Sequence, residues 1–203
     1  MSGQFHFDAS TYESTIRGEV VDYDVLQTAV ADATPDRPVA RILDLGAGTG
    51  QTSRRVLERH PQGRLVLLDE SPDMLAVATR TLPTGCVEAV LVGDLRGALP
   101  RGPFDLVISC LAIHHLYAPE KGELFRRVAG RLAPRGCFVM GDVVTPNSPT
   151  EARIALDPDY DHPSRVDELL KLLGAGQLVP SVTWQRADLA VLRAEPKIPD
   201  SDA

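Results

Sequence analysis

Three glycines alternate directly after a short apolar run, in the stretch ARILDLGAGTGQTSRRVLE at residues 40–58. Gly46, Gly48 and Gly50 lie where the apolar run ends and an amphipathic pattern begins. Glycine adopts positive φ at little cost and lets a ligand come close to the backbone. A turn of this kind between a strand and a helix lays its N–H groups around a ligand. The pattern predicts a ligand site at this turn.

An acidic residue, Asp69, ends the next apolar run, 19 residues after Gly50. In nucleotide-binding folds an acid at the tip of the second strand accepts hydrogen bonds from the ribose hydroxyls. The ligand is therefore predicted to carry a ribose. A dinucleotide fingerprint is Gly-x-Gly-x-x-Gly, but here the third glycine comes one residue early and Gln51 stands in its place.

Polar residues that could act on a second molecule follow the later apolar runs. His114 and His115 follow one run, Asp142 lies near the end of another, and His162 lies in a long loop. Ligands bind beyond the carboxyl ends of the strands in open parallel sheets. We interpret His115, His162 and Asp142 as candidate catalytic residues, with either histidine as general base. The alternative is that the histidines only pack and hydrogen-bond.

No metal site is predicted. Adjacent histidines in a strand-like segment point to opposite sides, which argues against a ligand set of His114, His115 and Asp142. Two further polar residues, Tyr160 and Asp161, lie in the long loop on the acceptor side.

Alternating helices and strands must position these residues. A helix is predicted over residues 8–34, because Leu26, Ala29, Val30 and Ala33 mark one helical face. The other predicted helices cover 50–60, 72–82 and 120–132, with a last one opened by Ser164, paired with Asp167 in a capping box, and ended by Gly174. Strands are predicted at 41–45, 64–69, 87–92, 104–110 and 137–144.

The predicted strands are continuous apolar runs, which is typical of strands covered on both faces. Together with right-handed crossovers this indicates an α/β, doubly wound parallel sheet. Two last strands, at 181–185 and 188–194, are joined by Arg186-Ala187 and therefore form an antiparallel hairpin. The first seven residues and those from Pro196 are expected to be loose.

Composition bounds the class of protein. The chain has 203 residues, a net charge of −7 and 43% hydrophobic residues, which suits one soluble domain and argues against a nucleic-acid partner. Three cysteines far apart indicate free thiols in a reducing compartment. No signal peptide or membrane span is recognised, so a cytoplasmic location is predicted. The oligomeric state is not indicated.

Four motifs in order, LDLGAGTG, LLDESPDML, VGDL and FDLVISCLAIHHL, resemble those of the class I S-adenosylmethionine-dependent methyltransferases. The resemblance covers residues 40–145. It implies a Rossmann-like seven-stranded sheet of order 3-2-1-4-5-7-6, with strand 7 antiparallel, and S-adenosylmethionine as cofactor. It also implies one methyltransferase domain over 1–203, with an N-terminal helical lid at 8–36, a core at 40–195 and a flexible tail at 196–203.

The resemblance also implies cofactor-binding roles for residues that match the family motifs. Asp69 would hold the ribose, and the Asp94 carboxylate would accept from the adenine amino group. The full set is Tyr12, Arg17, Asp44, Gly46, Ala47, Gly48, Thr49, Gly50, Asp69, Glu70, Met74, Gly93, Asp94, Leu95, Cys110 and Leu111.

Ordinary structural roles are open for several of these residues. Asp94 could cap a turn, Met74 and Cys110 could be core, and Arg17 could be a surface arginine. In the lid interpretation, Tyr12 and Arg17 face the cofactor carboxylate.

The function that follows is methyl transfer to a small-molecule acceptor by in-line displacement. Alternatives are a tRNA-modifying methyltransferase, a non-catalytic S-adenosylmethionine-binding module and, disfavoured by the misplaced glycine, a dinucleotide oxidoreductase.

Overall fold

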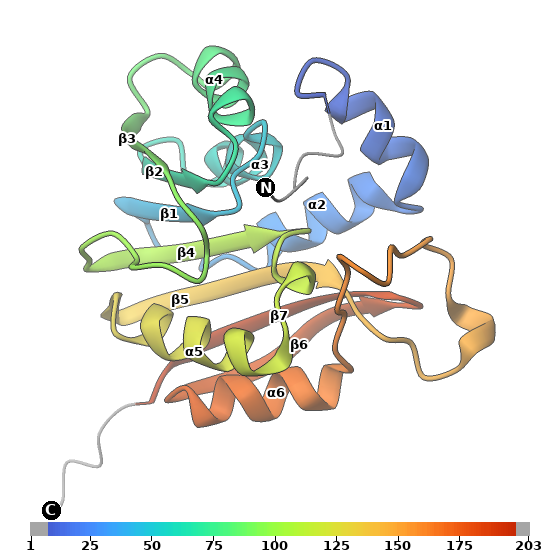
Figure 1. The fold of residues 1–203 in the computed structure, drawn as a ribbon. Helices are drawn as coiled ribbons and strands as arrows, with labels where there is room; N and C mark the ends of the chain where they lie inside the picture. Colours follow the sequence, from blue (N-terminus) through green and yellow to red (C-terminus); the bar gives the residue numbers. More distant parts are fainter. Residues whose placement is uncertain (1–7, 198–203) are drawn as a thin grey trace, which may run out of the picture.

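A seven-stranded sheet runs through the centre of the computed structural model, which describes residues 8–197 (Figure 1). The strands are β1 (Arg41–Leu45), β2 (Arg64–Asp69), β3 (Val87–Val92), β4 (Phe104–Cys110), β5 (Leu132–Val143), β6 (Leu178–Arg186) and β7 (Leu189–Pro196). The helices are α1 (Tyr12–Glu19), α2 (Tyr23–Asp32), α3 (Gln51–Arg59), α4 (Pro72–Thr81), α5 (Ala118–Ala129) and α6 (Val166–Ala175), with short 3-10 helices η1 (Ile113–His115) and η2 (Pro149–Glu151).

The strand order is β3-β2-β1-β4-β5-β7-β6. Strands β1 to β5 pair in parallel, and β7 is antiparallel to both β5 and β6. The predicted Rossmann-like order, with its reversed strand 7, is therefore confirmed. Because the carboxyl ends of parallel strands meet at one edge, the glycine turn after β1 and the histidines after β4 lie at the same edge of the sheet.

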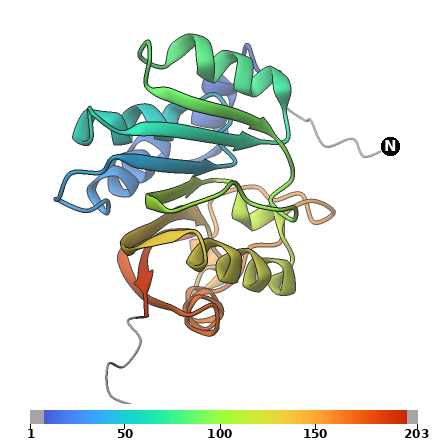
Figure 2. The same ribbon diagram turned by 90° about the vertical axis from the view of Figure 1, so that its left-hand side faces the viewer.

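Two buried apolar clusters sit on opposite faces of the sheet. One contains residues of α1 to α4, and the other contains residues of α5 and α6. Strand β3 is an exception to the predicted two-sided cover, since Val92 is 63% exposed. The chain passes from β3 to β4 through residues 93–103 without a helix, so β3 packs against α4 on one face and has no helix of its own crossover on the other (Figure 2).

The single helix predicted over 8–34 is wrong, because the chain breaks into α1 and α2. Asp22 takes a left-handed conformation with φ of 69°, and Val20 is extended. Val20, in the break, and Tyr23, at the start of α2, are both buried in the apolar cluster on this face of the sheet. The apolar pattern that suggested one helix belongs to α2 alone.

The observed bounds of α5 and β5 also differ from the predicted ones. Helix α5 begins earlier than predicted, with a proline in its first turn, and ends at Ala129, not at residue 132. Strand β5 begins at Leu132, five residues before the prediction, and includes Pro134 and Gly136.

The predicted capping box of the last helix is also wrong. Helix α6 begins at Val166, and Ser164 instead accepts a hydrogen bond from the Lys121 ammonium at 3.0 Å. Asp167 pairs with Lys171, and the helix continues past Gly174 to Ala175.

The predicted hairpin of β6 and β7 is confirmed as antiparallel, with longer strands and a turn at residues 187–188. Pro196 belongs to β7, contrary to the predicted tail from that residue. The predicted loose residues 1–7 and 198–203 lie outside the described part of the chain. Among residues 8–197, no helix is both long and apolar enough to cross a membrane.

Candidate active site

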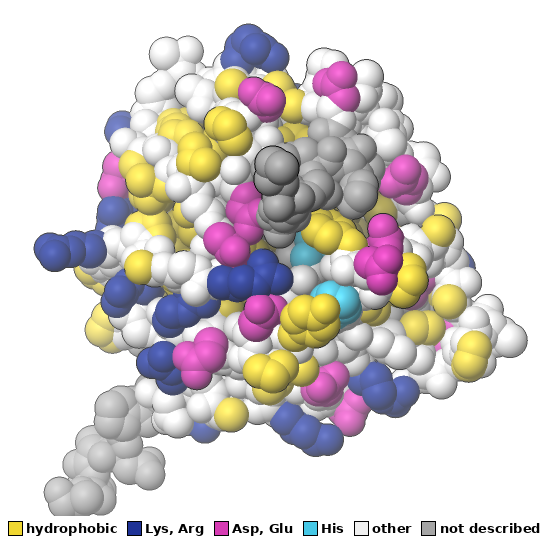
Figure 3. All heavy atoms as spheres, viewed as in Figure 1, with side chains coloured by type: hydrophobic (Ala, Val, Ile, Leu, Met, Phe, Trp, Pro, Cys, Tyr) yellow, Lys and Arg dark blue, Asp and Glu magenta, His cyan; other side chains and the backbone are white. Residues whose placement is uncertain are grey.

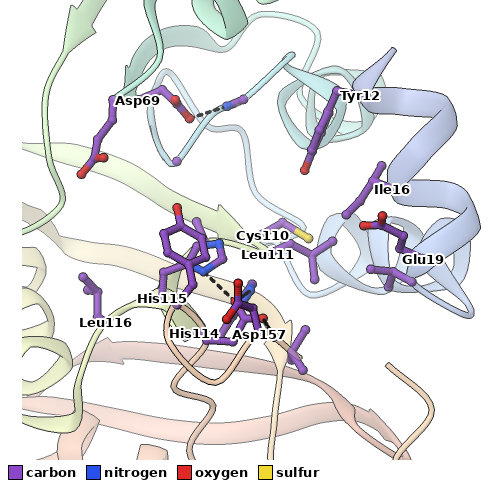
Figure 4. Close-up of a pocket in the computed structure, with 18 of the residues that line it drawn as sticks. Tyr12, Ile16, Glu19, Asp69, Cys110, Leu111, His114, His115, Leu116 and Asp157 are labelled. Atoms are coloured by element: carbon purple, nitrogen blue, oxygen red, sulfur yellow. Dashed lines mark hydrogen bonds and ion pairs between the residues drawn. The ribbon is translucent and has the colours of Figure 1, made fainter. Parts of the chain in front are cut away.

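A cavity of about 720 Å³ opens at the carboxyl edge of the sheet. Its walls come from the glycine turn after β1, the ends of β2, β3 and β4, helix α1, η1 and the segment 153–161 (Figure 4). On the molecular surface, histidine side chains are visible near the centre of this face, among acidic, basic and apolar groups (Figure 3). A cavity of this size can hold a nucleoside-sized ligand together with a small second molecule.

The glycine turn leaves room for a ligand, but few of its backbone N–H groups are free to donate a hydrogen bond to one. Gly46, Gly48 and Gly50 all have positive φ, as the sequence indicated. The N–H groups of Gly46 and Ala47 donate to the Leu68 carbonyl, that of Gly50 donates to the Ala47 carbonyl, and that of Gly48 donates to a side chain. The expectation that these N–H groups surround a ligand is therefore wrong for these four residues.

Close approach is the feature of the turn that remains. A Cβ added at Gly46 would overlap Ala112, so that glycine is required by the packing of the fold. A Cβ added at Gly48 would have no protein atom within 4 Å, and Gly48 lines the cavity. The backbone at Gly48 is therefore bare toward the cavity, as a ligand lying against it requires.

Asp69 lies at the tip of β2, facing the cavity (Figure 4). One carboxylate oxygen accepts from the Gly48 N–H and the other from the Ser71 N–H, each at 2.8 Å. Burial raises the pKa of Asp69, while these two hydrogen bonds act in the opposite direction. Each oxygen keeps a lone pair for a ligand hydroxyl, since a carboxylate oxygen accepts more than one hydrogen bond.

Beyond Asp69 the cavity has an acidic and apolar lining. Glu70 and Asp94 lie close enough that burial and the Asp94 carboxylate raise the pKa of Glu70. Met74 and Leu95 are both 8% exposed and line the same region, with Gly93 at the end of β3. An aromatic base between these two apolar side chains would have carboxylates within reach of its polar edge.

Helix α1, which was predicted to act as a lid, presents one face to the cavity. Tyr12, Ile16 and Glu19 line it, at the i, i+4, i+7 spacing of one helical face (Figure 4). Arg17 lies on another face, where it pairs with Glu13 at 3.0 Å and with Asp24. The predicted joint role of Tyr12 and Arg17 is wrong, because residues five apart on a helix point about 140° apart. The same periodicity could have identified Ile16 and Glu19.

Four other predicted cofactor residues, Asp44, Ala47, Thr49 and Gly50, are not among the lining residues of the cavity. Asp44 is 1% exposed, and its Oδ2 accepts from the Ser53 hydroxyl at 2.6 Å. Burial raises the pKa of Asp44 to about 7, against the effect of that hydrogen bond. Asp44 lies near the end of β1, and Ala47, Thr49 and Gly50 belong to the turn without lining the cavity.

The end of β4 forms the middle of the cavity. Cys110 and Leu111 both line it, and Leu111 has a φ of 55°. Burial raises the pKa of the Cys110 thiol, so the thiolate that a nucleophile needs is disfavoured. Cys110 therefore serves as a wall of the cavity.

The two adjacent histidines lie in the 3-10 helix η1 and not in a strand-like segment. Their ring centroids are 3.9 Å apart, so the premise that they point to opposite sides is wrong. His114 is held by Asp142, whose Oδ1 lies 2.5 Å from His114 Nδ1 and whose Oδ2 accepts from the His114 N–H at 2.9 Å.

His115 lines the cavity beside the long loop. Its ring packs on Tyr160 at 4.3 Å between centroids, and its Nδ1 lies 3.0 Å from Asp161 Oδ1. Burial and the His114 ring lower the pKa of His115 to about 4, which leaves the ring neutral near pH 7.

His162 and Asp142, the other two candidate catalytic residues, are not among the lining residues of the cavity. The His162 ring stacks on Tyr117 at 3.9 Å, and its carbonyl accepts from Lys121. Asp142 is 2% exposed, and its carboxylate accepts from His114 and from the backbone N–H of Val143. Sequence spacing could not reveal the His114–Asp142 contact, because it joins residues 28 positions apart.

The segment 153–161 closes the far side of the cavity and was not identified as a whole from the sequence. The Arg153 guanidinium pairs with Asp22, in the turn between α1 and α2, at 2.8 Å. The N–H groups of Arg153 and Ile154 donate to the buried Asp188 carboxylate. The turn between α1 and α2 therefore meets the segment 153–161 beside the cavity.

Known proteins that are similar to this chain are methyltransferases or share their fold. A family model described as a methyltransferase domain matches residues 42–136. A trans-aconitate 2-methyltransferase of Methylobacterium nodulans is 33% identical over 124 residues, covering 60% of this chain and 46% of that protein. A trans-aconitate 2-methyltransferase of Mycobacterium tuberculosis is 31% identical over 139 residues, covering 64% and 51%. The chain spans about half the length of these relatives.

Among solved structures, one described as the DhpI–SAH complex superimposes with a TM-score of 0.73 and 22% identity, covering 93% of this chain and 91% of that one. This likeness shows the shared fold. Together with the family match, it confirms the resemblance drawn from the sequence motifs.

Proposed function

We propose that this chain, a class I S-adenosylmethionine-dependent methyltransferase by its domain at residues 42–136, transfers a methyl group to a small-molecule acceptor. One observation carries the proposal: a single cavity joins Gly48 and Asp69 at one end to His115 and Tyr160 at the other. A donor and an acceptor can therefore lie in contact, shielded by helix α1 and the segment 153–161.

The residues present fit the donor. S-adenosylmethionine supplies an electrophilic methyl group on a sulfonium, which a nucleophile displaces in line. The bare backbone at Gly48 leaves room that a side chain would fill. Asp69 has lone pairs for two ribose hydroxyls, and Asp94 accepts from the adenine amino group between Met74 and Leu95. The predominance of carboxylates at this end favours a cationic ligand.

On the acceptor side, His115 is the candidate proton acceptor. Its ring lines the cavity, and its lowered pKa keeps it neutral. A neutral imidazole within hydrogen-bond reach can take the proton of a hydroxyl acceptor. His162 and Asp142 have positioning roles in this proposal, because neither lines the cavity.

The acceptor is proposed as a small molecule because little of the cavity remains beside a nucleoside-sized donor. Trans-aconitate, named for the relatives, is the first acceptor to test; its ionised carboxylates need no general base, so the role proposed for His115 applies to hydroxyl acceptors. The cytoplasmic location and the domain limits stay predictions.

The test is calorimetric titration with S-adenosylmethionine, S-adenosylhomocysteine and NAD in parallel. Binding of the first two alone supports the proposal, and binding of NAD alone or of none contradicts it. Mass spectrometry of acceptor mixtures with S-adenosylmethionine, trans-aconitate included, then seeks a product 14 mass units heavier than its acceptor. If no acceptor is methylated by a chain that binds the donor, the proposed catalysis is replaced by a binding role.

A further inference from the structure

Two histidines and one aspartate converge at the acceptor end of the cavity. His115 Nδ1 lies 3.0 Å from Asp161 Oδ1, and His114 Nε2 lies 3.6 Å from the same oxygen. One ligand atom from each of the three residues lies within 4.8 Å of the others. We propose that His114, His115 and Asp161 bind a divalent transition-metal ion.

The spacing of these atoms matches that of ligands around such an ion. Nitrogen and oxygen ligands bind at roughly 2.0–2.2 Å, so neighbouring ligands are about 3.0 Å apart in an octahedral site and about 3.4 Å in a tetrahedral one. The separations of 3.0 and 3.6 Å from Asp161 Oδ1 are close to these values, and the two histidine nitrogens lie within 4.8 Å of each other. An ion therefore fits after small movements of side chains.

Two of the ligands are oriented by further hydrogen bonds. Asp142 accepts from the His114 Nδ1 side at 2.5 Å, which turns the Nε2 lone pair of a neutral ring toward Asp161. Asp161 Oδ2 accepts from the Asp157 N–H at 2.8 Å, which leaves Oδ1 facing the rings. A carboxylate behind a ligating histidine is the usual support of a metal site.

The electron-rich atoms of this cluster face one another, and a positive charge between them would be favourable. A lone pair on His114 Nε2 facing the Asp161 carboxylate is unfavourable unless a cation or a proton lies between them. His115 Nδ1 is buried and, despite its 3.0 Å distance from Asp161, has no aligned hydrogen bond. A bound cation would satisfy all three groups at once.

The side chains around the cavity supply no free cation among the described lining residues. Arg96 pairs with Glu120 at 2.7 Å and with Asp94, and Arg153 pairs with Asp22 and Asp188. Three protein ligands would leave coordination positions open toward the cavity, since all three residues line it. The ion would then bind a hydroxyl or carboxylate oxygen of the acceptor and lower the pKa of a hydroxyl. It would replace His115 as the group that activates the hydroxyl, because a neutral ring bound to the ion through Nδ1 has no lone pair left to accept a proton. Only this last role rests on the proposed methyl transfer.

The test is calorimetric titration of the EDTA-treated, tag-free full chain with ZnCl₂. We expect one Zn²⁺ per chain in the wild type and in the control Asp159→Asn, an exposed residue of the same loop that is neither in the cluster nor in the cavity lining. Asp161→Asn and His115→Ala should weaken binding by at least about tenfold. His114→Ala is avoided, because it would leave the buried Asp142 without its partner.

S-adenosylhomocysteine titration of each variant checks that the fold is intact. The wild-type protein allows a second measurement, by ¹⁵N NMR spectra of the histidine rings. Zn²⁺ should shift the ring nitrogen resonances of two of the five histidines. The proposal is overturned if the wild type binds no Zn²⁺, or if Asp161→Asn and His115→Ala, with S-adenosylhomocysteine affinity retained, bind it as the wild type does. Zn²⁺ binding without S-adenosylhomocysteine binding would contradict the proposed donor and leave the metal site standing.

Discussion

Replacing Gly48 by alanine should separate ligand contact from backbone strain. Gly48 has a φ of 51°, and its added Cβ would meet no protein atom within 4 Å. An alanine there costs roughly 1–2 kcal/mol in unfolding free energy, because the left-handed region crowds the Cβ. The same Cβ projects into the cavity where the donor is proposed to lie, so it must displace the donor or strain the turn.

Overpacking of a well-fitted site costs about 1–3 kcal/mol. On that basis, S-adenosylhomocysteine should bind Gly48→Ala roughly 5- to 150-fold more weakly than the wild type. Calorimetric titration measures the affinity, and urea unfolding measures the stability.

Gly85 provides a matched control. It has a φ of 81°, its added Cβ would also meet nothing within 4 Å, and it is not a lining residue of the cavity. Gly85→Ala should lose similar stability and keep its affinity for S-adenosylhomocysteine. If Gly48→Ala binds the ligand as tightly as Gly85→Ala does, the close approach of the donor to this turn is refuted.

Three further predictions concern groups beneath and beside the cavity. Asp69→Ala should weaken S-adenosylhomocysteine binding by about 1.5–3 kcal/mol, and unchanged affinity in calorimetry would contradict the ribose role. The pKa of Asp44 rises from 3.8 to about 7 on folding, so the stability linked to its proton is present below pH 4 and lost as pH rises through about 7. Ser53→Ala removes a hydrogen bond that lowers the pKa of Asp44, so the loss of unfolding free energy should extend above pH 7 in this variant. Urea unfolding at pH 5, 7 and 9 measures it, and a profile equal to that of the wild type would contradict the effect of this bond on Asp44. Lys121→Met should cost about 1–3 kcal/mol of unfolding free energy by leaving the His162 carbonyl without its donor, and no loss on urea unfolding would show that water replaces it.

The strands and their order could be anticipated from the sequence because each depends on local composition or on the family motifs. RILDL and FDLVISC are apolar runs bounded by turn residues, and they are β1 and β4 with the predicted limits. Asp69 could be located because its position depends only on the strand that it ends.

The errors have a common physical origin in contacts between residues far apart in the chain. Ser164 was interpreted as a helix cap, but it meets Lys121, 43 residues away. The histidine rings could not be oriented without the loop that brings Asp161 back to them. Local periodicity contains no information on such contacts. The joint role of Tyr12 and Arg17 is a different kind of error, because helical periodicity alone places the two residues on different faces of one helix.

One carboxylate holds the two covers of the cavity together. Asp22, in the turn after α1, accepts from Arg153 at 2.8 Å and from Arg186 at 3.2 Å, and its side chain is 17% exposed. The lid and the 153–161 segment cannot separate without breaking the pair of Asp22 and Arg153. The two charges lie well within the screening length of about 8 Å at physiological salt and are largely buried, so dissolved ions weaken this pair little. Asp22→Asn should therefore increase the rates at which small molecules enter and leave the cavity far more than raising the ionic strength does, even for uncharged molecules.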